Sequence, residues 1–300
     1  MHQRLTYSTV LMLTLPPLLW AGNAVVGRMV APLVPPLTLN FLRWALAFVL
    51  LLPFAWSLLR AESPLWPRFP RFAVLGLLGV GCYNAFQYLA LKTSTPINVT
   101  LVGSSIPAFM LGLGALFFHQ RITRRQVLGA VLSIAGVLLV LARGELQHLG
   151  QVRFVRGDLY MLVATCSWAL YSWLLARPGD PPEIRSNWAG FLMAQMVPGL
   201  LWSGLFAATE TVVGRQSIQW GWPLAAALAF VATGPALLAY RLWGVGVQRV
   251  GPNIAGFFSN LTPLFAALFS AAFLGEAPHA YHALAFALIV GGIVVSSRRN

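Results

Sequence analysis

Aromatic and neutral polar side chains recur at helical spacing inside long apolar segments of this 300-residue chain. Trp20 and Asn23 are three positions apart, so they share one face of a helix. Trp168 and Tyr171 repeat the spacing in a later segment. Because lipid cannot satisfy polar groups, we expect such residues to face an internal cavity that binds a solute. The candidate binding residues are Trp20, Asn23, Arg43, Tyr83, Gln87, Ser104, Ser105, Trp168, Tyr171, Trp188, Gln195, Tyr240 and Asn260.

The same residue types also have structural uses. Trp and Tyr form belts at membrane interfaces, and Ser, Asn and Gln bridge neighbouring helices. Arg43 lies about two turns inside an apolar segment, where a charge is costly and is a functional candidate by default. It could bind a substrate carboxylate, extend toward the interface or hold helix-end carbonyls. The sequence leaves these alternatives open.

Acid–base and metal chemistry have no evident residues. All seven carboxylates lie in loops or at segment ends, and so do the five histidines. A buried relay of such groups is typical of proton-driven carriers, so we expect facilitated diffusion, with proton coupling as the alternative. Cys82 and Cys166 have no neighbour at metal or disulfide spacing. No catalytic constellation, metal site or cofactor is predicted, which disfavours a membrane enzyme.

Composition indicates an integral membrane protein, because 58% of the residues are hydrophobic and only 9% are charged. The net charge of +13 is dispersed among segment ends, so nucleic-acid binding is not expected. About 20 residues span a bilayer, and ten apolar segments can be drawn. They are residues 8–30, 37–59, 70–91, 96–118, 125–142, 157–176, 187–207, 221–243, 252–274 and 280–297.

Ten crossings place both termini on one side of the membrane. Thirteen of the twenty Lys and Arg residues then fall on the side of the termini, and six fall on the other: Arg28, Lys92, Arg143, Arg153, Arg156 and Arg215. The positive-inside rule therefore predicts cytoplasmic termini.

The chain also repeats itself. A shift of 156 residues superimposes Pro96 on Pro252, Pro107 on Pro263 and Gly136 on Gly292 without a gap. The repeat unit has five helices, an odd number, so the halves must be inverted relative to each other. We assign residues 1–148 to the first half and 149–300 to the second, which together form one transport domain. Inverted repeats typically enclose a midplane site and expose it alternately to each side, which favours a carrier over a receptor or scaffold.

Motifs in both halves resemble the EamA-type branch of the drug/metabolite transporter superfamily. They are Leu19-Trp20-Ala21-Gly22-Asn23, Asn40-Phe41-Leu42-Arg43-Trp44-Ala45, Ser104-Ser105-Ile106-Pro107, Leu261-Thr262-Pro263 and Leu274-Gly275-Glu276. The resemblance implies an all-α, ten-helix carrier in a bacterial inner membrane that exports small metabolites. It is closest to amino-acid exporters, including those for aromatic amino acids. Exporters of drugs, nucleobases or other metabolites are the alternative. In the first half the position that matches Glu276 is Gln120.

Small residues at helical spacing favour close helix packing in two segments: Gly129, Ser133 and Gly136 in segment 125–142, and Ala285 and Gly292 in segment 280–297. They would join these helices to their own neighbours or support a weak homodimer. We therefore expect a monomer or a weak dimer, with the lipid bilayer and a small-molecule substrate as the partners.

Overall fold

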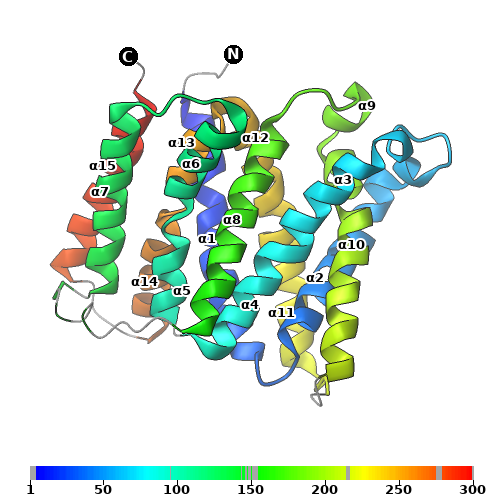
Figure 1. Cartoon of the computed structure of the whole chain (residues 1–300). Helices are drawn as coiled ribbons and strands as arrows, with labels where there is room; N and C mark the ends of the chain where they lie inside the picture. Colours follow the sequence, from blue (N-terminus) through cyan, green and yellow to red (C-terminus); the bar gives the residue numbers. More distant parts are fainter. Residues whose placement is uncertain are drawn as a thin grey trace.

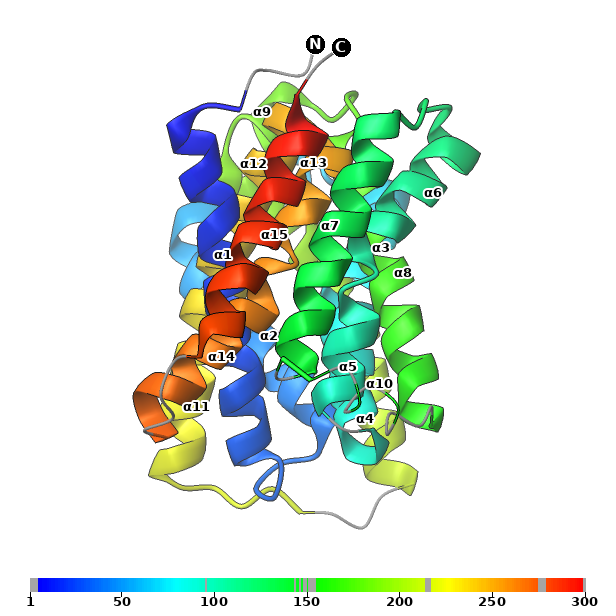
Figure 2. The same ribbon diagram turned by 90° about the vertical axis from the view of Figure 1, so that its left-hand side faces the viewer.

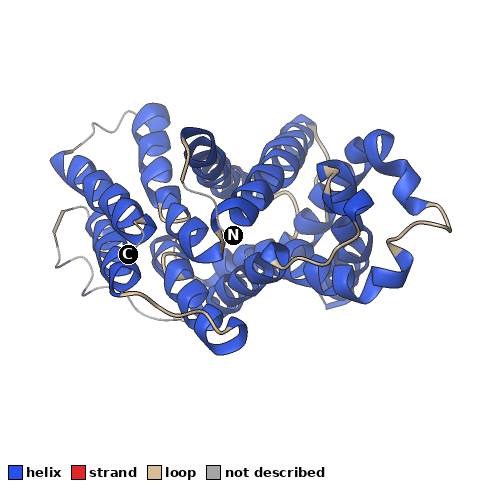
Figure 3. Cartoon of the chain, turned by 90° about the horizontal axis from the view of Figure 1, so that it is seen from above, coloured by secondary structure: helices blue, strands red, loops and turns tan. Residues whose placement is uncertain are grey.

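The computed structural model describes residues 5–94, 96–142, 144–145, 147, 150, 155–213, 217–274 and 279–298. Within these ranges the chain is helical and contains no strand (Figure 3). The predicted boundary at residues 148–149, Glu276 and most of the linker between the halves lie outside the described residues.

The first half begins with α1 (Tyr7–Val30), which starts behind a Thr6 N-cap, and ends with α7 (Arg124–Leu141), which starts with a Thr123–Gln126 capping box. Its other elements are α2 (Pro36–Ala55), η1 (Trp56–Leu59), η2 (Trp66–Arg68), α3 (Phe69–Gly76), the π-helix η3 (Leu77–Cys82), α4 (Tyr83–Thr93), α5 (Pro96–Gly103) and α6 (Ile106–Phe118).

The second half follows the same order. Its elements are α8 (Arg156–Ala176), α9 (Pro182–Arg185), α10 (Trp188–Val213), α11 (Trp222–Val231), the π-helix η5 (Ala232–Leu238), α12 (Ala239–Val250), α13 (Pro252–Phe258), α14 (Leu261–Leu274) and α15 (Ala280–Ser297). The π-helices and the interruptions at Ser104–Ser105 and Ser259–Asn260 occupy corresponding places in the two halves.

The two halves are inverted, as the sequence predicts. α1 begins and α15 ends at the same end of the bundle (Figure 2), which we call the terminal end; the opposite end is the far end. α1 runs toward the far end, whereas its counterpart α8 runs toward the terminal end (Figure 1).

Nine helical stretches within the described ranges are long and apolar enough to cross a membrane. The predicted segment 252–274 is not among them; it consists of α13 and α14, joined by the turn at Ser259–Asn260. The count of ten crossings therefore stays a prediction. Pro16, Pro17 and Pro198 lie within continuous helices, so the chain does not break at these prolines.

The small-residue faces pack on each other within one chain. α7 and α15 lie side by side at one edge of the molecule (Figures 1 and 2). A Cβ added at Gly129 would lie 2.7 Å from the carbonyl oxygen of Gly292, and one at Gly136 would lie 2.8 Å from that of Ala285. These faces thus join each helix to a neighbour within the chain, and that neighbour is the other of the two helices.

Candidate functional site: a central cavity on an aromatic core

The centre of the bundle is an aromatic cluster around Trp168, which is fully buried. α8 carries this indole at its midpoint, and five rings from both halves surround it at centroid distances of 4.7 to 5.5 Å. These rings are Trp20, Tyr83, Tyr171, Tyr240 and Trp243. Several contacts are edge-to-face, including that between Trp20 and Trp168 at 86°, the arrangement that aromatic quadrupoles prefer.

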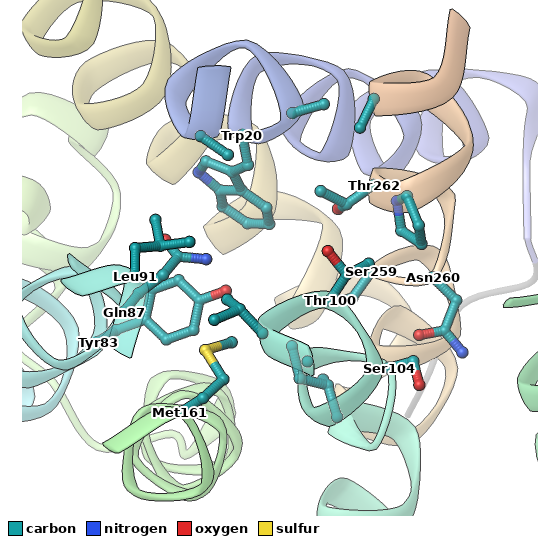
Figure 4. A pocket seen from close by; sticks show the side chains of 17 residues that line it. Trp20, Tyr83, Gln87, Leu91, Thr100, Ser104, Met161, Ser259, Asn260 and Thr262 are labelled. Atoms are coloured by element: carbon teal, nitrogen blue, oxygen red, sulfur yellow. The ribbon is translucent and has the colours of Figure 1, made fainter. Parts of the chain in front are cut away.

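A cavity of about 100 Å³ lies beside this cluster, between α1, α4, α5, α6, α8, α14 and the turn that joins α13 to α14. It contains both aromatic and neutral polar side chains (Figure 4). The labelled lining residues are Trp20, Tyr83, Gln87, Leu91, Thr100, Ser104, Met161, Ser259, Asn260 and Thr262. All the residues that line the cavity are among the described ones, and none of them is Asp, Glu, Lys, Arg or His.

The interruptions of the two broken helices face this central cavity. The Ser104 hydroxyl donates to the Leu101 carbonyl at 2.7 Å, and the Asn260 amide donates to Ser133 Oγ at 2.9 Å. Two buried lining atoms, Asn260 Oδ1 and Ser259 Oγ, have no hydrogen-bond partner among the described residues. Such atoms are costly to bury unless a ligand or water satisfies them, so they are candidate contacts for a bound solute.

Side chains also stabilise the π-helices beside the cavity. The Tyr240 hydroxyl donates to the Gly79 carbonyl at 2.5 Å, and the Asn40 amide donates to the Val80 carbonyl at 3.0 Å. In the second half, Trp20 Nε1 donates to the Pro235 carbonyl at 3.3 Å. π-Bulges occur often at functional sites, and here predicted site residues support them.

Tyr171 of the aromatic cluster forms a buried pair with Gln195. The Tyr171 hydroxyl donates to Gln195 Oε1 at 2.9 Å, and Gln195 Nε2 donates to the Phe191 carbonyl at 2.8 Å. A Cβ added at Gly79 would lie 2.7 Å from the Tyr171 ring, so this glycine permits the close approach of η3 to α8. These residues position the cluster, and the cavity lining does not include them.

Arg43 lies in a separate polar network between α1, α2 and α4. Its guanidinium is fully buried, and Nη1 donates to Asn23 Oδ1 and to the Tyr88 hydroxyl, both at 3.3 Å. The Tyr88 hydroxyl in turn donates to Asn23 Oδ1 at 2.9 Å. Arg43 Nε and Nη2 have no acceptor among the described residues. The guanidinium thus bridges three helices and does not line the central cavity.

The remaining predicted residues lie elsewhere. Ser105 donates to the Val102 carbonyl within the helix interruption. Trp188 begins α10, where the Arg241 guanidinium lies 4.4 Å from the centroid of its ring. Gln120 donates to the Phe118 carbonyl at the end of α6. The structure therefore brings Trp20, Tyr83, Gln87, Ser104 and Asn260 together around the cavity.

Several site residues were not predicted. Trp243 is the counterpart of Gln87 after the shift of 156 residues, so the repeat could have indicated it. Met161, Thr100 and Thr262 line the cavity, but nothing in their type or spacing distinguishes them from ordinary helix-packing residues.

An ionic cluster joins the halves at the terminal end. The carboxylate of Asp180, whose side chain has no exposed surface, accepts hydrogen bonds from Arg71 on α3 and from Arg185 on α9. Arg71 Nη2 also donates to the carbonyls of Leu174 and Arg177 at 3.2 Å each. We call Arg71, Asp180 and Arg185 the ionic latch.

An inverted pair of helical repeats around a nearly uncharged central cavity defines a membrane transporter. Sequence comparison agrees: the model of the EamA-like transporter family matches residues 7–142 and 155–298. The chain belongs to this family. That membership places it among transporters rather than enzymes.

Two relatives that are named as exporters agree with membership of this transporter family. The aromatic amino acid exporter YddG of Ancylobacter novellus is 28% identical over 244 residues, covering 80% of this chain and 78% of the relative. A probable amino-acid metabolite efflux pump of Salmonella typhimurium is 26% identical over 284 residues, covering 92% and 90%. A solved crystal structure shares the fold with a TM-score of 0.73 at 23% identity, covering 96% of both chains.

Proposed function

We propose that this transporter exports amino acids, aromatic ones among them, by alternating access through the central cavity. The observation that carries the proposal is the lining: aromatic faces and neutral hydrogen-bonding groups without an Asp, Glu, Lys, Arg or His side chain. Such a lining suits a zwitterionic solute with an apolar body, because rings can stack while Asn260 Oδ1 accepts hydrogen bonds and Ser259 Oγ accepts or donates them. The printed names of two relatives also refer to amino acids.

The cavity must expand to hold such a solute. Its volume of about 100 Å³ is below the roughly 300–1,000 Å³ typical of ligand sites. Toward the terminal end the helices pack tightly: Trp173 Nε1 donates to the Met110 carbonyl at 2.8 Å, and a Cβ added at Gly256 would lie 2.6 Å from Met110 Sδ. We infer that transport alternates between separation of the helices at the terminal end and at the far end.

Export is proposed to be facilitated diffusion. Besides Asp180 of the ionic latch, the buried Asp158 and the half-buried Glu210 are bound at helix ends: Asp158 caps α8 through the Val155 amide, and Glu210 accepts from the amide and hydroxyl of Thr38. Neither lines the central cavity, where a coupling proton would have to compete with substrate. The distribution of Lys and Arg supports cytoplasmic termini in the inner membrane of a bacterial cell.

Purified protein in liposomes tests the proposal. Labelled phenylalanine should enter with saturable kinetics, and competition by the twenty amino acids should exceed competition by nucleobases or quaternary amines. Flux should not respond to an imposed pH gradient when the voltage is clamped. Stronger competition by nucleobases or quaternary amines, together with acceleration by the pH gradient, would instead favour the proton-coupled drug or nucleobase exporter.

A matched pair of variants links flux to the cavity. Trp20→Ala removes an aromatic ring from the cavity lining and should abolish flux, whereas Trp188→Ala, at the start of α10, should keep most of it. Both variants remove the same atoms, and size-exclusion profiles must show that both remain folded. Equal flux through the two variants would contradict the placement of the substrate path.

A further inference from the structure

A second and larger cavity lies at the far end of the first half. It measures about 370 Å³ and lies between the last turn of α1, the connection to α2, the start of α2 and the last turns of α4. Most of its wall is apolar, and Arg28 and Lys92 contribute the only charges among its lining residues. We call it the far-end pocket. Its volume is within the range of small-molecule sites.

The two rim cations form no ion pair with a carboxylate among the described residues. Asp158 accepts from Ser94, which also lines the pocket, and from the Val155 amide, while Glu210 is bound to Thr38. The far-end pocket therefore combines an apolar wall with a positive rim.

The second half does not repeat the two cations at identical positions. The shift of 148 residues that superimposes Trp20 on Trp168 places Arg28 on Ala176, and the shift of 156 residues places Lys92 on Gln248. Arg177 and Arg249 directly follow these positions, so each half carries cations near this place of the repeat.

A buried cation lies behind the pocket. Tyr88 lines the far-end pocket with its ring, and its hydroxyl accepts from Arg43 Nη1. Because Arg43 is fully buried and has no ion pair with a described carboxylate, its charge adds to the positive potential at this wall. The far-end pocket thus has two cations at its rim, from α1 and α4, and a third cation, from α2, buried behind its wall.

We propose that the far-end pocket binds an amphipathic anion. Its apolar body packs against the wall, and its carboxylate or phosphate lies between Arg28 and Lys92. The anion has two possible sources, a soluble carboxylate or the headgroup of an acidic lipid, which share this chemistry. The far-end pocket shares only Leu91 with the lining of the central cavity, and the proposed anion site does not require a particular transported substrate.

Binding to the full-length protein in phosphatidylcholine nanodiscs tests the proposal. The soluble probe is 3-phenylpropanoate, measured by calorimetry, and its neutral amide is the ligand control. The double variant Arg28→Gln/Lys92→Gln should bind the carboxylate at least about fivefold more weakly, as expected for two partly exposed charged contacts. Arg68→Gln/Arg121→Gln removes the same charge from exposed positions outside the pocket and should bind normally.

The lipid source has its own measurement. Native mass spectrometry of protein in nanodiscs that contain phosphatidylglycerol should show bound lipid that the Arg28→Gln/Lys92→Gln variant loses and the Arg68→Gln/Arg121→Gln control keeps. Dependence of either probe on the two rim cations supports the anion site and identifies its source. Equal losses in both double variants, or no binding of either probe, would overturn it. Neither measurement depends on transport, so the anion-site proposal can be tested even if the proposed export of amino acids proves wrong.

Discussion

The ionic latch should hold the terminal end closed. Arg71 belongs to the first half, whereas Asp180 and Arg185 belong to the second, so separation of the halves at this end must break the contacts of Arg71. Asp180→Asn keeps one acceptor oxygen but removes the charge. We expect this variant to populate a state that is open at the terminal end more strongly than the parent protein does.

The size of the effect follows from burial. Breaking a fully buried ion pair costs about 3–5 kcal/mol. The Asp180 side chain is 0% exposed but that of Arg71 is 22% exposed, and water there screens part of the interaction. Asparagine also retains a neutral hydrogen bond, so we expect the closed state to lose about 1–2 kcal/mol. That corresponds to a population shift of about 5–30-fold.

Spin labels can measure the shift. Ala61 in the loop before α3 and Glu183 in α9 are exposed and belong to different halves. Cys82 and Cys166 are first replaced by alanine, and spin labels are attached to cysteines introduced at positions 61 and 183. The distribution of distances between the two labels should contain a larger long-distance population in Asp180→Asn than in the parent protein. Arg68→Gln removes an exposed charge near Arg71 and is the control. Identical distance distributions in both variants would refute the latch.

Three further outcomes are expected. Gly292→Ala should lower the free energy of unfolding of the detergent-solubilised protein by about 1–3 kcal/mol, because the added Cβ would lie 2.6 Å from the Gly129 carbonyl oxygen. Gly291→Ala is the control: its added Cβ has no other atom within 4 Å, so the substitution should be neutral or stabilising. Arg43→Gln should lower stability but leave unchanged the ratio of KM for phenylalanine and its amide, and a selective loss for phenylalanine would assign Arg43 to the substrate carboxylate. Glu210→Gln should cost about 1 kcal/mol, since it weakens the cap of α2, and unaltered thermal unfolding would contradict that role.

The repeat made much of the architecture predictable. The shift that superimposes Pro107 on Pro263 also superimposes Ser104 on Asn260, and both residues lie in helix interruptions beside the cavity. Residue type alone could not separate lining residues from supporting ones. Trp20 and Trp168 have equal status in the sequence, yet only Trp20 lines the cavity, because the rings of both halves surround Trp168.

Other features depend on contacts that no local pattern reveals. η3 contains no proline, whereas η5 contains Pro235, so composition could not predict a π-helix in both halves. Arg43 could be recognised as an intramembrane charge, but its partners Asn23 and Tyr88 come from two other helices. The ion pair between Arg71 and Asp180 likewise could not be predicted, because the two residues are far apart in the sequence.

The terminal end and the far end of the bundle are closed by different interactions, as the shift of 156 residues between the halves shows. The counterpart of Arg71 after the shift of 156 residues is Ala227. Ala227 belongs to an apolar cluster with Val34 and Leu228 at the far end. An ionic latch weakens as salt screens its partly exposed arginines, whereas apolar packing is not weakened by salt in this way. Raising the ionic strength should therefore favour opening at the terminal end over opening at the far end, and the Ala61–Glu183 label pair should report the change in the parent protein but not in Asp180→Asn.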